Sequence, residues 1–192
     1  MKIQAWVAAG LAALAAACGS APKLNYYTLT TPPASKNAGS PLSVFVGPVT
    51  VPEGVDRPQM VLRSGPNEVA IDEFHRWAEP LKSAIPHVLA DSLMRELGTQ
   101  RVMTTRQSSS LAFDYRVAVD VQRFDSSLDE GAAIDALWTI RSAKGGEPRT
   151  GRTVARESAP SRDPQGVAAA HSRALESLAR DIAAAIRTLD SR

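Results

Sequence analysis

A single cysteine, Cys18, is the feature that most constrains the fold of this chain of 192 residues. One cysteine cannot form an intrachain disulfide, and it cannot supply the paired thiolates of a structural zinc site or of a two-cysteine redox motif. Apolar residues make up 44% of the sequence and charged residues 22%, as in an ordinary globular chain. The fold must therefore rest on a hydrophobic core, which a chain of this length can build without disulfides or structural metal ions.

The cysteine lies at the end of an apolar N-terminal segment. Lys2 gives this segment a positive start, and mostly small apolar residues occupy positions 5–17. The run has the length of a signal-peptide core, and it is shorter than the roughly 20 apolar residues that a membrane-spanning helix needs. We therefore expect residues 1–17 to be a signal peptide. The alternative is an ordinary signal peptide that is cleaved near Ala16 or Ala17. The cysteine would then be buried or incidental.

Residues 14–20 read Leu-Ala-Ala-Ala-Cys-Gly-Ser and resemble the lipobox of bacterial lipoproteins, although Ala15 stands where that motif favours leucine. The resemblance implies cleavage between Ala17 and Cys18, with diacylglycerol and an N-acyl chain such as palmitate attached to Cys18. Acyl chains contribute about 0.8 kcal/mol per buried methylene, so several of them hold a protein on a bilayer. Gly19, rather than aspartate, follows the cysteine, which implies transport to the outer membrane, facing the periplasm. Residues 18–24 would then form the lipidated N-terminus and tether of a domain at residues 25–192.

Hydrophobic periodicity divides this domain into strands and two helices. Alternating or β-branched segments predict strands at residues 25–29, 42–46, 49–51, 60–63, 68–71, 101–104, 115–122, 134–141 and 149–156. Apolar residues spaced by three and four predict a helix over residues 84–97, with Ser83 as its N-cap and Pro86 in its first turn. A second, longer helix is predicted over residues 164–189, with Asp163 as its N-cap.

The order of these elements is strands, helix, strands, helix. Such an order favours helices that pack on one face of a sheet. We therefore predict an α+β fold of two layers, with a mainly antiparallel sheet and two helices packed on one face. The second strand is expected to bend at Gly47-Pro48.

Few residues are arranged for chemistry. The 22 Lys and Arg nearly balance the 20 Asp and Glu, which argues against a basic nucleic-acid surface over the whole domain. His75, His87 and His171 have no partners at an established zinc spacing. The serines at 108–110 lack the glycine context of a nucleophile elbow. Three acidic residues are expected in a solvated loop: Asp125, Asp129 and Glu130. We therefore expect no catalytic residues, no metal and no cofactor beyond the covalent lipid.

Residues 74–81, Phe-His-Arg-Trp-Ala-Glu-Pro-Leu, combine two aromatic rings with charges of both signs. Trp and Arg are over-represented at interface hot spots, which makes Arg76, Trp77 and Glu79 candidate partner-binding residues. The alternative is structural, with Trp77 covering the core and Glu79 favouring the positive end of the following helix.

Four short blocks occur in a fixed order after the lipobox, at residues 26–29 (Tyr-Tyr-Thr-Leu), 46–49 (Val-Gly-Pro-Val), 56–59 (Asp-Arg-Pro-Gln) and 76–81 (Arg-Trp-Ala-Glu-Pro-Leu). Together they resemble the ABC-type transport auxiliary lipoproteins, the family of PqiC. The resemblance implies a non-enzymatic lipoprotein that docks an MCE-domain protein, of the PqiB kind, at the outer membrane as part of an ABC-type phospholipid transport system. A surface near Arg57 and residues 76–79 would hold this partner, and a homo-oligomeric ring would match a symmetric MCE assembly.

Two other functions remain open at this point. A lipoprotein of this kind could instead plug, or assist the assembly of, another outer-membrane complex such as a lipopolysaccharide translocon. A periplasmic hydrolase would require activity that depends on a particular Ser, His or Asp.

The lipobox makes a prediction about Cys18. The variant Cys18→Ser removes the acylated thiol but no core residue, so the domain should fold and appear in the soluble periplasmic fraction. Fractionation of cells that produce the variant and the unchanged chain checks this. Retention of Cys18→Ser in the membrane fraction would contradict lipid anchoring.

Overall fold

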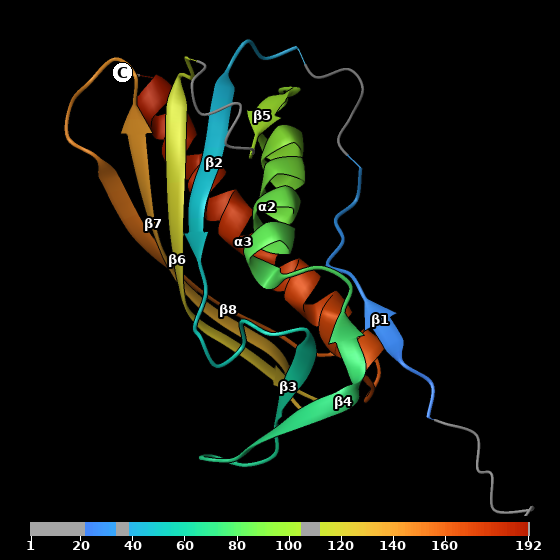
Figure 1. The fold of residues 1–192 in the computed structure, drawn as a ribbon. Coiled ribbons are helices and arrows are strands. Elements are labelled where there is room, and N and C mark those ends of the chain that lie inside the picture. Colours follow the sequence, from blue (N-terminus) through green and yellow to red (C-terminus); the bar gives the residue numbers. More distant parts are fainter. Residues whose placement is uncertain (1–21, 34–38, 105–111, 192) are drawn as a thin grey trace, which may run out of the picture.

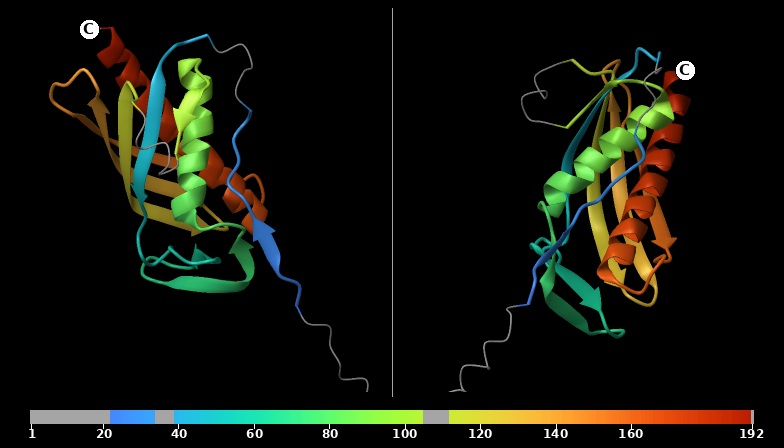
Figure 2. Two further views of the ribbon diagram at one scale, coloured as in Figure 1. Left: turned by 45° about the horizontal axis from the view of Figure 1, so that its top comes forward. Right: turned by 90° about the vertical axis from the view of Figure 1, so that its right-hand side faces the viewer.

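The computed structural model describes residues 22–33, 39–104 and 112–191, so Cys18 and the predicted signal peptide lie outside the described residues (Figure 1). The described part folds into a sheet of eight strands and two helices. Both helices cover the same face of the sheet (Figure 2). The predicted α+β class, with two helices on one face, is confirmed.

The elements follow the predicted order. They are β1 (Asn25–Tyr27), β2 (Ser43–Thr50), β3 (Gln59–Arg63), β4 (Val69–Trp77), α2 (Leu81–Leu97), β5 (Arg101–Met103), β6 (Tyr115–Ser127), β7 (Gly131–Ser142), β8 (Arg149–Glu157) and α3 (Pro164–Asp190).

Strand β6 is the centre of the sheet. One of its edges pairs antiparallel with β7, which pairs antiparallel with β8. Its other edge is shared, because Val44 of β2 lies opposite Tyr115 at the start of β6 and Leu62 of β3 lies opposite Ser126 near its end. Strand β5 extends the sheet beyond β2, and the β3–β4 hairpin followed by β1 extends it at the other end.

The sheet is mixed, which corrects the prediction of a mainly antiparallel one. The hairpin β3–β4 and the meander β6–β7–β8 are antiparallel, whereas the pairs β1–β4, β2–β5, β2–β6 and β3–β6 are parallel. Alternation in a sequence identifies a strand and its buried face, but it does not identify a neighbour that is distant along the chain.

The predicted bend in β2 is present. The peptide between Gly47 and Pro48 is cis, and the register of β2 against β6 shifts between Val46 and Val49. A single strand with a shift in register therefore spans this region, as the sequence predicted.

Helix α2 begins three residues before the predicted start. Its N-cap position is Pro80 and no side chain caps it, so Ser83 lies within the first turn rather than at the N-cap. Pro86 lies inside the helix, where it removes one backbone hydrogen bond. Burial of the apolar face, including Leu81 and Ile85, offsets that loss. The helix ends at Gly98, whose left-handed conformation lets its N–H bond to the carbonyl of Met94.

Helix α3 confirms the predicted cap. The carboxylate of Asp163 accepts a hydrogen bond from the Gly166 N–H at 2.7 Å, and Pro164 occupies the first turn. The bond from Gly166, with a second from Ser161, lowers the pKa of Asp163. The helix then runs for 27 residues, about 40 Å, along the sheet.

A polar chain ties α3 to the meander. The Trp138 ring lies over Gly151, where any Cβ would collide with it. Its Nε1–H donates to Thr153 Oγ1 at 3.2 Å, and that hydroxyl donates to Asp181 Oδ2 of α3 at 2.7 Å. The sheet and the helix are therefore joined by hydrogen bonds as well as by apolar packing.

The β6–β7 turn makes a prediction about Gly131. This glycine has φ +88°, and an added Cβ would collide with the backbone of Glu157 and Ala159. Gly146 has a similar φ of +92° with open space around it, so it is a matched control. We expect Gly131→Ala to lower the free energy of unfolding by about 3 kcal/mol or more, and Gly146→Ala by about 1 kcal/mol. Urea unfolding measures both, and equal losses would contradict the crowding at Gly131.

Candidate functional site

Three of the four candidate partner-binding residues lie at one corner of the domain. The loop after β2 folds against the end of β4, because the Trp77 N–H donates to the Pro58 carbonyl at 2.7 Å. The start of α2 is tied to the same loop by an ion pair of 2.5 Å between Lys82 and Asp56. We call Arg57, Arg76 and Glu79, which these contacts bring to one place, the corner surface.

The charges of the corner surface are available to a partner. Arg57 is exposed and forms no ion pair with another described residue. The Arg76 guanidinium lies 3.7 Å from the Glu73 carboxylate, and the Glu79 carboxylate lies 3.7 Å from Nδ1 of His87. Pairs that are this exposed contribute little to stability, so a partner could replace them at small cost.

Trp77, the fourth candidate, is a core residue. Its side chain is only 6% exposed, and its ring meets the rings of Phe124 and His171 edge-on at 6.1 Å. Trp77 therefore packs in the core, as the structural interpretation has it, and it is not part of the corner surface.

His171 lies in the core beside Trp77. Its ring stacks on Phe124 with the centroids 3.7 Å apart, and its Nε2 lies 2.8 Å from Ser126 Oγ. Nδ1 is buried and has no hydrogen-bond partner among the described residues. Complete burial lowers the pKa of His171 to about 3, so the ring is neutral. We place its proton on Nε2, because a buried N–H without an acceptor costs more than a bare lone pair.

The Ser126–His171 pair consists of the residue types of a nucleophile and its base. Both side chains are sealed in the core, with His171 at 0% and Ser126 at 4% exposure. The ring also lacks a described acceptor at Nδ1 that would orient it as a base. The contact therefore acts in packing. Sequence reasoning missed it, since the two residues are 45 positions apart.

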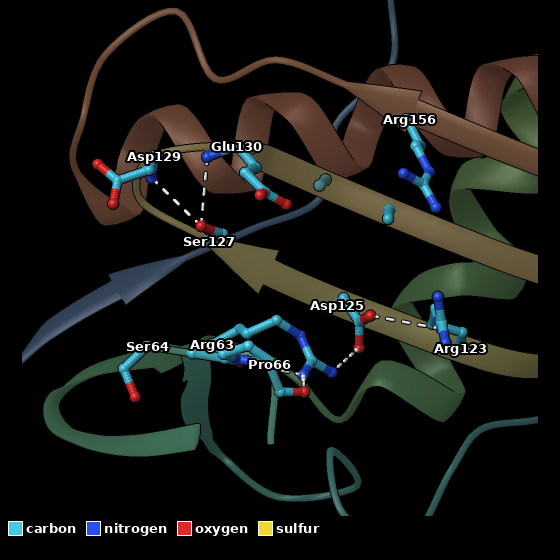
Figure 3. Close-up of a pocket in the computed structure, with 13 residues that line it drawn as sticks. Arg63, Ser64, Pro66, Arg123, Asp125, Ser127, Asp129, Glu130 and Arg156 are labelled. Atoms are coloured by element: carbon cyan, nitrogen blue, oxygen red, sulfur yellow. Dashed lines mark hydrogen bonds and ion pairs between the residues drawn. The ribbon is translucent and has the colours of Figure 1, made fainter. Parts of the chain in front are cut away.

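A polar groove of about 550 Å³ lies between the β3–β4 turn and the ends of β6, β7 and β8 (Figure 3). Asp125 is at its centre, 3.0 Å from the Arg63 guanidinium and 3.4 Å from that of Arg123. Arg63 also donates to the Pro66 carbonyl at 3.0 Å. Arg156, from β8, lines the groove and forms no ion pair with a described residue.

The acidic residues that were expected in a loop divide between two settings. Asp125 lies within β6, which corrects that expectation, because β6 continues to Ser127. Asp129 and Glu130 are in the turn that follows, and their N–H groups donate to Ser127 Oγ. The groove therefore offers balanced charges of both signs. Its arginines come from three strands that are brought together only by the sheet, so no local sequence motif predicts them.

The described ranges hold neither a metal-binding cluster nor a membrane-spanning helix. No group of three or more His, Cys, Asp or Glu there could hold a metal ion. None of the helices there is both long enough and apolar enough to cross a membrane.

The fold and these surfaces define a small α+β domain with a polar corner and a polar groove. The chain belongs to the family described as the ABC-type transport auxiliary lipoprotein component, whose family model matches residues 27–183. Among curated proteins, none matches the chain significantly.

Two solved structures share the fold. One is the protein XCC0632 from Xanthomonas campestris, described as a member of DUF330, with 19% identity, a TM-score of 0.64, and coverage of 82% of this chain and 92% of the other. The second is described only as an uncharacterized protein, with 19% identity, a TM-score of 0.66, and coverage of 85% of this chain and 99% of the other. At this identity the likeness establishes the fold.

The buried His171 makes a prediction about acid stability. In the unfolded chain this residue binds a proton near pH 6.5, whereas in the folded protein it stays neutral down to about pH 3. The unfolded state thus binds more protons in this window, and the free energy of unfolding falls as the pH is lowered, by up to about 1.4 kcal/mol per pH unit.

The variant His171→Gln, which keeps a group able to bond Ser126, should flatten this dependence between pH 6.5 and pH 5. Urea unfolding at several pH values measures it. His87→Gln is the control, since the His87 side chain is 56% exposed. An unchanged slope in His171→Gln would contradict a neutral, buried ring.

Proposed function

We propose that this chain is a non-enzymatic lipoprotein that docks the periplasmic end of an ABC-type lipid transport system at the outer membrane. The observation that carries this proposal is the match of the auxiliary-lipoprotein family model to residues 27–183, which is most of the domain. The transported lipid is a phospholipid, and the partner is an MCE-domain protein of the PqiB kind, as the ordered sequence blocks imply.

Attachment is the first step of the proposed role. Diacylglycerol and an N-acyl chain on Cys18 hold the protein in the periplasmic leaflet of the outer membrane. Asn25, the first residue of β1, comes seven positions after Cys18. A segment of this length spans at most about 25 Å, so the domain stays close to the bilayer.

Docking is the second step, and the corner surface supplies it. Arg57 and Glu79 present opposite charges from two segments that are held in place by the Trp77–Pro58 hydrogen bond. A rigid corner with weakly paired charges suits a partner of complementary charge, because little conformational freedom is lost on binding. A ring of copies would repeat this corner around a symmetric MCE assembly.

Charge reversal at the corner surface tests docking. We expect Arg57→Glu and Glu79→Arg each to lower recovery of the MCE-domain protein from solubilised envelopes about tenfold, a change of about 1.4 kcal/mol. Both sites are on the surface, so the free energy of unfolding should change by less than about 0.5 kcal/mol. Affinity purification with partners identified by mass spectrometry gives the measurement.

Arg149→Glu is the matched control, because Arg149 is also exposed but lies at the start of β8, away from the corner. Equal recovery from all variants would contradict docking at the corner surface. Recovery of a β-barrel with lipopolysaccharide, in place of an MCE-domain protein, would favour the lipopolysaccharide-translocon role.

A further inference from the structure

Exposed apolar side chains gather on the strands at one end of the sheet. Tyr26 of β1 is 60% exposed, and Val69, Ile71 and Phe74 of β4 are 54%, 45% and 44% exposed. We call these four residues the apolar strip. Exposed apolar groups of this kind mark an interaction surface when they form one patch rather than being scattered singly.

The register of β3 and β4 places the first part of the strip on the face away from the helices. Met60 is fully buried in the core, so Val61, its neighbour along β3, points to the opposite face. Ile71 lies opposite Val61, and Val69 lies opposite Arg63, which also points outward into the groove. Directly opposed residues share a face, so Ile71 and Val69 are on the outer face as well.

A bulge in β4 keeps the second part of the strip on the same face. Asp72 lies opposite Met60, but Arg76 lies opposite the adjacent Gln59, so β4 has three extra residues here. The Asp72 carboxylate fixes the bulge, because it accepts hydrogen bonds from the N–H groups of Phe74 and His75 at 3.0 and 3.1 Å. The backbone at Phe74 and His75 is therefore held in place. Counting back from Trp77, which faces the core, Arg76 and Phe74 alternate to the outer face.

Strand β1 completes the strip. Tyr27 lies opposite Trp77, and both side chains pack toward the core. Tyr26 lies opposite Arg76, so both point to the outer face between these inward residues. The strip thus runs over two neighbouring strands, with the Arg76 guanidinium beside it, 3.7 Å from the Glu73 carboxylate.

The tether shows which surface this strip faces. This step rests on the proposed lipidation of Cys18, which places β1 within about 25 Å of the bilayer. Helix α3 contacts β1 near its N-terminal end and extends for 27 residues, about 40 Å, toward the opposite end of the domain (Figure 1). The end that carries β1, β3 and β4 is therefore the end nearest the membrane.

We propose that the apolar strip lies on the bilayer to which Cys18 is anchored, with Tyr26 and Phe74 at the headgroup level. Aromatic rings favour this interface between the headgroups and the acyl chains. The tether makes the contact intramolecular, so a weak intrinsic affinity is sufficient to keep it formed. The contact fixes the orientation of the domain, which a flexible tether alone does not.

Two tryptophan variants test the contact in the lipidated protein purified from envelopes. Phe74→Trp reports on the strip, and Met103→Trp is the control, because Met103 has a similar exposure of 42% but lies on β5 at the opposite end. Both variants share the buried Trp77 and Trp138 as background. The proteins are reconstituted into vesicles of phosphatidylethanolamine and phosphatidylglycerol with brominated acyl chains.

After subtraction of the emission of the unchanged chain, we expect the introduced tryptophan of Phe74→Trp to emit at shorter wavelength than that of Met103→Trp. Its emission should be about twofold weaker in brominated than in unbrominated vesicles, while that of Met103→Trp stays unchanged. Ile71→Trp should behave like Phe74→Trp and provides a second probe of the same surface. Unquenched emission at both strip positions, in protein that floats with the vesicles, would overturn the contact. Protein that fails to float would instead overturn the anchor itself, and the contact with it.

A photo-crosslinking residue at position 74, in cells, separates the other occupants. Adducts with phospholipid support the proposal. Adducts with a second copy of the chain or with a periplasmic protein, in place of lipid, would assign the strip to a protein interface and overturn it.

Discussion

The pairing of β6 with three other strands is the constraint on which the rest of the structure depends. Val117, Val119 and Val121 alternate toward the helices. The register with β7 then shifts between Val121 and Arg123, so that Phe124 and Ser126 still face the core. The same shift directs the charged side chains of Arg123 and Asp125 to the outer face.

This local shift determines both the core and the surface near it. Phe124 and Ser126 hold His171, and Phe124 also supports Trp77 at the end of β4. On the outer face, Asp125 holds Arg63 and so fixes the β3–β4 hairpin against β6. The corner surface, the groove and the apolar strip all lie at the end of the domain that carries β1, β3 and β4. In the proposed role, this arrangement brings partner binding and membrane contact close together.

Much of the fold could be predicted from the sequence because its signals are local. Alternation predicted the long strands of the meander, and Asp163 with Pro164 predicted the start of α3. The predicted start of α2 was wrong, because no side chain caps the helix and burial of its apolar face offsets the presence of Pro86 within it. The parallel pairings could not be predicted, because each joins strands that are distant in the sequence and leaves no local pattern.

The candidate site divides in the same way. The segment at residues 74–81 was found from its composition, but only the contacts of Trp77 with Phe124 and His171 place that ring in the core. The groove was missed, because Arg63, Arg123 and Arg156 meet only through the register of the sheet.

Cross-linking mass spectrometry of intact envelopes tests the proposed docking most directly. Lys82, which pairs with Asp56 beside the corner surface, should cross-link to an MCE-domain protein, whereas Lys144 in the β7–β8 turn should not. Cross-links to that protein from Lys144 alone would contradict docking at the corner.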